Sequence, residues 1–185
     1  MTAPTGDVLA VFGGSFDPPH VAHTLVAAYV LAAHEVDRVL VVPCFRHPFD
    51  KPLAPFEHRA RMCEIAMRDL PQVEVSTIEA ELGTTSRTLP MLEALHARHP
   101  DAQLRLVIGS DLVAETPTWH AFDRIRALAP PLVIPRAGHV ADATEPALPA
   151  ISSTEVRRRL REGLPTTGLV DPEVAAYARA HALYR

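Results

Sequence analysis

A glycine-rich turn between two apolar segments, at residues 11–23, constrains the fold of this chain more than any other feature. Its sequence is V-F-G-G-S-F-D-P-P-H-V-A-H, with a short apolar run before it and a helix-forming stretch after it. Glycines let a ligand approach the backbone closely, and a helix start directs free N–H groups and a positive dipole end toward the same place. His20 and His23 then share one face of the first helical turn. This arrangement favours a nucleotide phosphate that takes part in a reaction.

Apolar runs alternate with amphipathic stretches along most of the chain, which indicates parallel strands joined by right-handed crossovers. The predicted fold class is therefore α/β, with a doubly wound parallel sheet. Ligands of such sheets bind at the carboxyl ends of the strands, where the glycine turn and Gly109-Ser110-Asp111 both fall. A loop is predicted for residues 137–149. The predicted strands are 8–12, 38–42, 73–76, 104–108 and 131–134, and the predicted helices are 21–36, 55–69, 88–98, 119–129, one that opens at 152–155, and 172–181.

Length and composition predict one domain over residues 1–185, whose C-terminal part is helical and begins near Ile151. The net charge of −4 argues against a nucleic-acid partner. The longest apolar run, residues 25–33, is too short to span a membrane. We find no pattern of a signal peptide, and Cys44 and Cys63 form no metal or disulfide motif. A cytoplasmic protein is expected, and the sequence leaves open whether it forms a homo-oligomer.

A second candidate phosphate site is the segment I-S-S-T-E-V-R at residues 151–157. Hydroxyls and backbone N–H groups at a helix start bind anions, and Arg157 is one turn further along, where it is placed to clamp a triphosphate. Ser152 and Glu155 also fit a capping box, which is the alternative interpretation for this segment alone. Its occurrence together with the glycine turn favours phosphate binding. The remaining arginines, Arg158, Arg159 and Arg161, are expected to face solvent.

These two motifs resemble the nucleotidylyltransferase superfamily, whose fingerprints are G-G-S/T-F-D-P-x-H-x-G-H and I-S-S-T-x-x-R. Gly109-Ser110-Asp111, followed by Thr118-Trp119, is similar to the G-x-D…T-W block of the bacterial nicotinate-nucleotide adenylyltransferase family. The resemblance covers nearly the whole chain. It implies a Rossmann-like nucleotidylyltransferase fold and adenylyl transfer from ATP to nicotinate mononucleotide. The products would be deamido-NAD and pyrophosphate, in NAD biosynthesis, with Mg²⁺ accompanying ATP.

The resemblance also implies roles for individual residues. Both histidines would donate hydrogen bonds to ATP phosphates; a metal site is the alternative, but no third ligand lies nearby in sequence, so none is predicted. Trp119 would stack on the pyridine ring, although a lone tryptophan also suits a core. The implied catalytic residues are His20, His23, Lys51 and Arg157. The implied ATP-binding residues are Gly13, Gly14, Ser15, Phe16, His20, His23, Gly109, Asp111, Ile151, Ser152, Ser153, Thr154 and Arg157, and the implied acceptor-binding residues are Ser15, Phe16, Lys51, Thr84, Thr85, Trp119 and Arg136.

Three of these roles have plain alternatives. Asp111 is expected at a ribose hydroxyl or a magnesium-bound water, but an aspartate at a strand end also caps turns. Lys51 is the only lysine of the chain and follows the second predicted strand, although lysines are mostly surface residues. Arg157, taken without the first motif, equally suits a solvated helix face.

Several positions depart from the family pattern, mostly on the acceptor side. Ala22 replaces a glycine, and Asp50 replaces a histidine in the loop that carries Lys51. The loop at residues 83–89 is matched to S-Y-T-x-x-T-L, with glycine for serine and no tyrosine. Its backbone amides would hold the nicotinate carboxylate. Three alternatives therefore stay open: nicotinamide mononucleotide as acceptor, 4′-phosphopantetheine as acceptor, and a nucleotide-binding regulator that has lost turnover.

Overall fold

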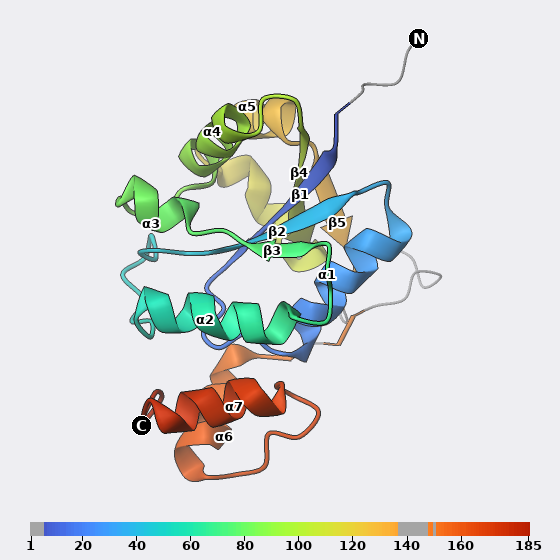
Figure 1. Ribbon diagram of the computed structural model, residues 1–185. Coiled ribbons are helices and arrows are strands. Elements are labelled where there is room, and N and C mark those ends of the chain that lie inside the picture. Colours follow the sequence, from blue (N-terminus) through green and yellow to red (C-terminus); the bar gives the residue numbers. More distant parts are fainter. Residues whose placement is uncertain (1–5, 137–147, 150) are drawn as a thin grey trace.

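A single five-stranded sheet organises the chain in the computed structural model, which describes residues 6–136, 148–149 and 151–185. All strand pairs are parallel, and the strand order is β3-β2-β1-β4-β5. The chain adds strands on one side of β1 and then on the other, so the order reverses between β1 and β4. This confirms the predicted doubly wound α/β fold (Figure 1). The strands are β1 (Val8–Gly14), β2 (Arg38–Pro43), β3 (Val73–Val75), β4 (Gln103–Gly109) and β5 (Pro131–Ile134).

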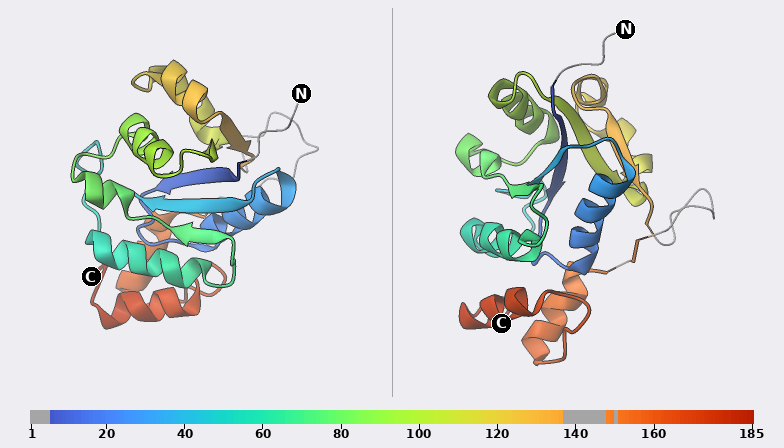
Figure 2. Two further views of the ribbon diagram at one scale, coloured as in Figure 1. Left: turned by 45° about the horizontal axis from the view of Figure 1, so that its top comes forward. Right: turned by 45° about the vertical axis from the view of Figure 1, so that its right-hand side comes forward.

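Helices cover both faces of the sheet, because alternate side chains of each buried strand point to opposite faces. On β1, Leu9 and Val11 belong to the core packed against α3, α4 and α5, whereas Ala10 belongs to the core packed against α1 and α2. Figure 2 shows α1 on one side of the sheet and α3 and α4 on the other. The helices are α1 (Val21–Ala33), α2 (Phe56–Met67), α3 (Ile78–Leu82), α4 (Thr88–Arg98) and α5 (Phe122–Leu128).

The C-terminal helices pack against α2 rather than on the sheet, as Figure 1 shows. They are α6 (Ser153–Glu162) and α7 (Pro172–Ala180). Met62 of α2, Val156 of α6 and Val174 of α7 are fully buried in a common cluster. The two helices predicted in this part of the chain are therefore present, while the division of residues 1–185 into a single domain with a helical C-terminal part stays a prediction. None of the helices in the described ranges is both long and apolar enough to cross a membrane.

The structure corrects the predicted elements at four places. Both α3 and a 3₁₀-helix, η1 (Ser110–Thr118), were missed. The helix predicted from Trp119 begins instead at Phe122, because Trp119 is extended and Ala121 is left-handed, with φ 56°. The first helix ends at Ala33 rather than at residue 36. Most of the loop predicted at residues 137–149 lies outside the described residues.

Candidate active site

The glycine turn, residues 11–23, runs from the carboxyl end of β1 into the first turn of α1. Phe16 has a left-handed backbone (φ 46°), and its ring is buried against His23, with ring centroids 4.8 Å apart. A Cβ on Gly14 would lie 3.0 Å from this ring, so a side chain at this position would press on the Phe16 ring. Because its ring is buried in this packing, Phe16 would contact a ligand through its backbone rather than through its ring. A Cβ on Gly13, by contrast, would meet nothing within 4 Å.

The two histidines stack at the start of α1, with ring centroids 3.7 Å apart and an interplanar angle of 20°. The backbone N–H of His20 donates to Nδ1 of His23 (3.1 Å). In the neutral form the His23 proton is therefore on Nε2, which becomes the donor. Burial, followed by the positive charge of Arg136, lowers the pKa of His20 to about 4. Burial, His20 and Arg136 lower the pKa of His23 well below its ordinary value.

Unsatisfied polar atoms mark the same edge of the sheet. In the described part of the chain, three buried side-chain atoms lack a hydrogen-bond partner, and two of them are Nδ1 of His20 and Oδ1 of Asp111. Buried polar groups are normally hydrogen-bonded, so each such atom requires an explanation. Two of the three lie on motifs that the sequence assigns to ligand binding, which supports a ligand site at this edge.

Asp111 and Arg136 form an ion pair at the ends of β4 and β5. Nη1 of Arg136 donates to Oδ2 of Asp111 (2.8 Å), and the Arg136 backbone N–H donates to the Ser110 hydroxyl (3.0 Å). A Cβ on Gly109 would lie 2.3 Å from Oδ1 of Asp111, so a side chain at this position would force the carboxylate to shift. The pair therefore places one cation and one free carboxylate oxygen at the carboxyl edge. Within the described ranges, no group of three or more His, Cys, Asp or Glu side chains forms a metal site.

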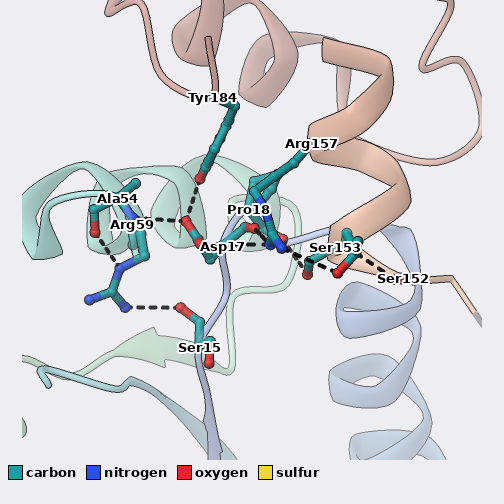
Figure 3. A network of polar contacts seen from close by, with 10 residues as sticks. Ser15, Asp17, Pro18, Ala54, Arg59, Ser152, Ser153, Arg157 and Tyr184 are labelled. Atoms are coloured by element: carbon teal, nitrogen blue, oxygen red, sulfur yellow. Dashed lines mark hydrogen bonds and ion pairs between the residues drawn. The ribbon is translucent and has the colours of Figure 1, made fainter. Parts of the chain in front are cut away.

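The second motif docks directly on the glycine turn (Figure 3). The Ser153 hydroxyl donates to the carbonyl of Pro18 (3.1 Å). Nη1 of Arg157 donates to the carbonyl of Asp17 (2.6 Å) and lies 3.7 Å from its carboxylate Oδ2. Thr154 accepts from Nη2 of Arg157 (3.2 Å). The structure therefore brings together two motifs that are far apart in sequence.

Only one of the two hydrogen bonds of the capping box, the alternative interpretation for residues 152–155, is present at the start of α6. Ser152 is the N-cap and accepts from the Thr154 backbone N–H (3.2 Å), as a cap should. Glu155, however, pairs with Arg158 and Arg159 of the same helix instead of turning back to the N-cap. Arg158 keeps the exposure that was predicted for it, although it is paired.

Two polar residues that the sequence analysis missed donate hydrogen bonds to the glycine turn. Arg59 of α2 is only 1 % exposed, and it donates to the carbonyls of Ser15 (2.9 Å) and Ala54 (2.8 Å). Tyr184, beyond α7, donates to Oδ1 of Asp17 (2.8 Å). An arginine among the apolar positions of α2 was a usable signal, whereas nothing in the sequence near Tyr184 points to Asp17.

The predicted acceptor loops lie next to each other, held together by Glu79 and Ser86. Glu79 is buried and accepts hydrogen bonds from the Phe45 backbone N–H (2.8 Å) and from the Ser86 hydroxyl. The Ser86 backbone N–H donates to the carbonyl of Arg46 (2.9 Å). The loop after β2 and the loop before α4 are therefore one connected unit. Neither Glu79 nor Ser86 was singled out from the sequence.

Four further residues predicted to bind the acceptor are exposed or half-buried. Lys51, Thr84 and Thr85 are exposed on these two loops. Trp119 is half-buried at the end of η1, and its ring meets Phe122 edge-on with centroids 6.1 Å apart. Trp119 therefore packs on the core with part of its surface and leaves part of it free.

The fold and the two docked motifs define a nucleotidyltransferase, and comparison with known proteins agrees. The cytidylyltransferase-like family model matches residues 11–159. A protein of Anaeromyxobacter sp. (strain K), named a probable nicotinate-nucleotide adenylyltransferase, is 48% identical over 97% of this chain and 98% of its own length. One of Myxococcus xanthus with the same name is 43% identical over 95% of this chain and 94% of its own. The chain belongs to the nicotinate-nucleotide adenylyltransferase family, as its motifs predicted.

Solved structures support the fold. The nicotinic acid mononucleotide adenylyltransferase of Plasmodium falciparum complexed with NaAD matches with a TM-score of 0.82 and 21% identity, over 96% of this chain and 97% of that one. The same protein complexed with APC matches with a TM-score of 0.79 and 20% identity, over the same shares of both chains. The nucleotidylyltransferase fold predicted from the motifs is therefore confirmed.

Proposed function

We propose that this chain transfers the adenylyl group of ATP to nicotinate mononucleotide, giving deamido-NAD and pyrophosphate. One observation carries the proposal: Ser153 and Arg157 dock on the Asp17–Pro18 segment, which only Pro19 separates from His20. This brings donors from both phosphate motifs to one edge of the sheet. The names of the relatives, at up to 48% identity over nearly the full chain, support the same reaction.

The proposed reaction needs no covalent enzyme intermediate. A phosphate oxygen of the mononucleotide attacks the α-phosphorus of ATP, the bond to the bridging oxygen breaks, and pyrophosphate leaves with both electrons of that bond. Charge builds up on the α-phosphoryl oxygens and on the leaving group. Donors fixed in place stabilise this charge more than they stabilise the ground state. We assign the donors at the α-phosphate to His20 and His23, and those at the leaving pyrophosphate to Arg157 and the start of α6.

Magnesium enters the proposed reaction as part of the substrate, MgATP. Hard cations such as Mg²⁺ keep several waters and bind one or two carboxylates together with substrate phosphates. Asp111 fits this role, because one carboxylate oxygen is paired with Arg136 and the other is without a partner in the described residues. We assign this oxygen to accept from a magnesium-bound water or from a ribose hydroxyl.

The acceptor side is proposed from the loops that Glu79 and Ser86 join. Lys51 supplies a cation for the mononucleotide phosphate, and Arg136 adds a second one. The Thr84–Thr85 backbone faces the ring substituent, where N–H groups favour a carboxylate over an amide. The half-exposed Trp119 offers a face for the pyridinium ring, a geometry stabilised by cation–π attraction.

Release of pyrophosphate, measured with MgATP and one acceptor at a time, tests the proposal. We expect nicotinate mononucleotide to give the highest kcat/KM, ahead of nicotinamide mononucleotide and 4′-phosphopantetheine. If another of the three gives the highest kcat/KM, adenylyl transfer is retained as the reaction and that compound replaces nicotinate mononucleotide as the acceptor. ATP binding without turnover on any of the three would make the chain a regulator and would contradict the proposal.

Gly13→Ala tests whether a ligand approaches the backbone of the turn. The added Cβ has free space in the protein, so we expect no loss of thermal stability. We expect a small rise in melting temperature, because glycine weakens a strand. If substrate occupies that space, kcat/KM for ATP or for the mononucleotide should fall about tenfold, equivalent to roughly 1.4 kcal/mol. Steady-state kinetics and a thermal melt on the same sample check this. Wild-type kinetics for the variant would place the substrate elsewhere.

Trp119→Ala should raise KM for nicotinate mononucleotide by about tenfold, since a stacked pyridinium contributes roughly 0.5–2 kcal/mol. KM for ATP should hardly change. Because the indole also packs on Phe122, Trp119→Phe is the matched variant: it keeps an aromatic face and should retain most of the affinity. Equal losses for both substrates would mean that Trp119 serves the core alone.

A further inference from the structure

We propose that Tyr184 is a positioning residue of this active site: its hydroxyl fixes the carboxylate of Asp17 and, through it, the guanidinium of Arg157. The inference rests on the proposed function, because Arg157 is taken to bind the triphosphate. Tyr184 follows α7 and belongs to the cluster that joins α2, α6 and α7. Figure 3 shows Tyr184 and Arg157 reaching Asp17 from different elements.

The contacts of Asp17 divide between its two carboxylate oxygens. Oδ1 accepts from the Tyr184 hydroxyl (2.8 Å) and from the Ala54 backbone N–H (3.2 Å). Oδ2 lies 3.7 Å from Nη1 of Arg157, which also donates to the Asp17 carbonyl (2.6 Å). Two donors on Oδ1 fix the plane of the carboxylate. That plane in turn keeps Oδ2 beside the guanidinium.

Burial makes this arrangement matter. Asp17 is 2 % exposed, so water has little access to replace a lost donor. Burial, together with the neighbouring Asp17 charge, raises the pKa of Tyr184, and its hydroxyl stays a donor at any physiological pH. The charged groups facing this cluster are Arg157 of α6 and Arg59 of α2.

The backbone leading to this contact is unusual. Ala182 and Tyr184 both have left-handed conformations, with φ of 55° and 65°, which residues other than glycine rarely adopt. Such conformations persist where the surrounding structure holds them, and they concentrate at functional sites. Here they turn the chain so that the Tyr184 ring packs in the C-terminal cluster and its hydroxyl reaches the turn.

Tyr184→Phe separates these two contributions, because it keeps the ring and removes only the hydroxyl. We expect KM for ATP to rise about two- to tenfold, the range of one hydrogen bond. KM for the mononucleotide and the melting temperature should stay near their wild-type values. A purely structural hydroxyl would not produce this split between the two substrates.

Tyr177→Phe is the matched control. Its hydroxyl also makes one hydrogen bond in the C-terminal part, to Nδ1 of His58 (3.0 Å), but it does not touch the glycine turn. We expect Tyr177→Phe to leave KM for ATP unchanged. A double-mutant cycle adds a second test: Tyr184→Phe should have less effect in an Asp17→Ala background, which removes the oxygen that accepts from the Tyr184 hydroxyl, because contacting residues do not act additively.

Calorimetry with an unreactive ATP analogue keeps this inference distinct from the proposed function. If the wild type neither binds the analogue nor releases pyrophosphate, the proposed function fails. If the wild type does both and Tyr184→Phe matches it in ATP binding, only the positioning role is overturned. Equal effects of Tyr184→Phe and Tyr177→Phe, or strictly additive effects with Asp17→Ala, would overturn it as well.

Discussion

His23→Ala should lower kcat by about 10²–10³-fold, roughly 3–4 kcal/mol of transition-state stabilisation, while ATP affinity changes little. The reason is that charge accumulates on the phosphoryl oxygens only during transfer, and Nε2–H of His23 is a donor already oriented by the bond from the His20 backbone to Nδ1. His20→Ala should act in the same direction. Steady-state kinetics and binding of an unreactive ATP analogue measure the two quantities separately.

Two variants serve as controls for this loss. His23→Gln keeps a side-chain N–H donor and an oxygen that can accept from the His20 backbone, so it should retain more activity than alanine. His58→Ala removes a histidine of α2 that contacts Tyr177 and stands outside the site, and it should leave kcat unchanged. A folded His23→Ala protein with near-wild-type turnover would remove this residue from the mechanism.

The sheet was predictable because its signals are local. Each strand is a short apolar run, and alternation with helices leaves few topologies once crossovers are right-handed. The elements that were not predicted show no comparable pattern of apolar residues. The helix α3 has only five residues, too few to show a helical repeat. The 3₁₀-helix η1 contains Pro117 and ends just before Trp119, and the prediction began a helix at Trp119 instead. The left-handed Ala121 that separates η1 from α5 carries no sequence signature.

The candidate site divides in the same way. Both phosphate motifs were visible, and so was the meeting of the glycine turn with Gly109-Ser110-Asp111 at one edge, because topology fixes where strands end. The docking of residues 151–157 on the glycine turn was not predicted. The supporting contacts were not visible, since they join positions far apart: Tyr184 and Asp17 are separated by 167 residues. Glu155 illustrates the opposite failure. Its local pattern fits a capping box, but in the structure its carboxylate forms ion pairs with Arg158 and Arg159 instead of turning back to the N-cap.

Arg157→Ala should weaken ATP binding by about 10- to 100-fold, because a hydrogen bond to a charged group contributes roughly 1.5–3 kcal/mol and 1.4 kcal/mol is tenfold. KM for the mononucleotide should change far less. The structure adds a second cause to the loss of phosphate donors. Arg157 is the cation facing Oδ2 of the buried Asp17, so its removal leaves this carboxylate with the donors on Oδ1 but without its charged partner, and we expect the turn to loosen.

Neighbouring and conservative variants separate these two causes. Arg158→Ala removes an exposed arginine of the same helix that pairs with Glu155 and Glu162 and does not contact the turn, so ATP affinity should stay at its wild-type value. Arg157→Lys keeps the charge beside Asp17 but loses the planar fork that binds phosphate bidentately, so it should restore thermal stability more than ATP affinity. Calorimetry with an unreactive ATP analogue, beside a thermal melt, gives both values. Unchanged affinity in Arg157→Ala would leave this arginine a structural partner of Asp17, and equal losses in Arg157→Ala and Arg158→Ala would reduce its effect to the general charge of α6.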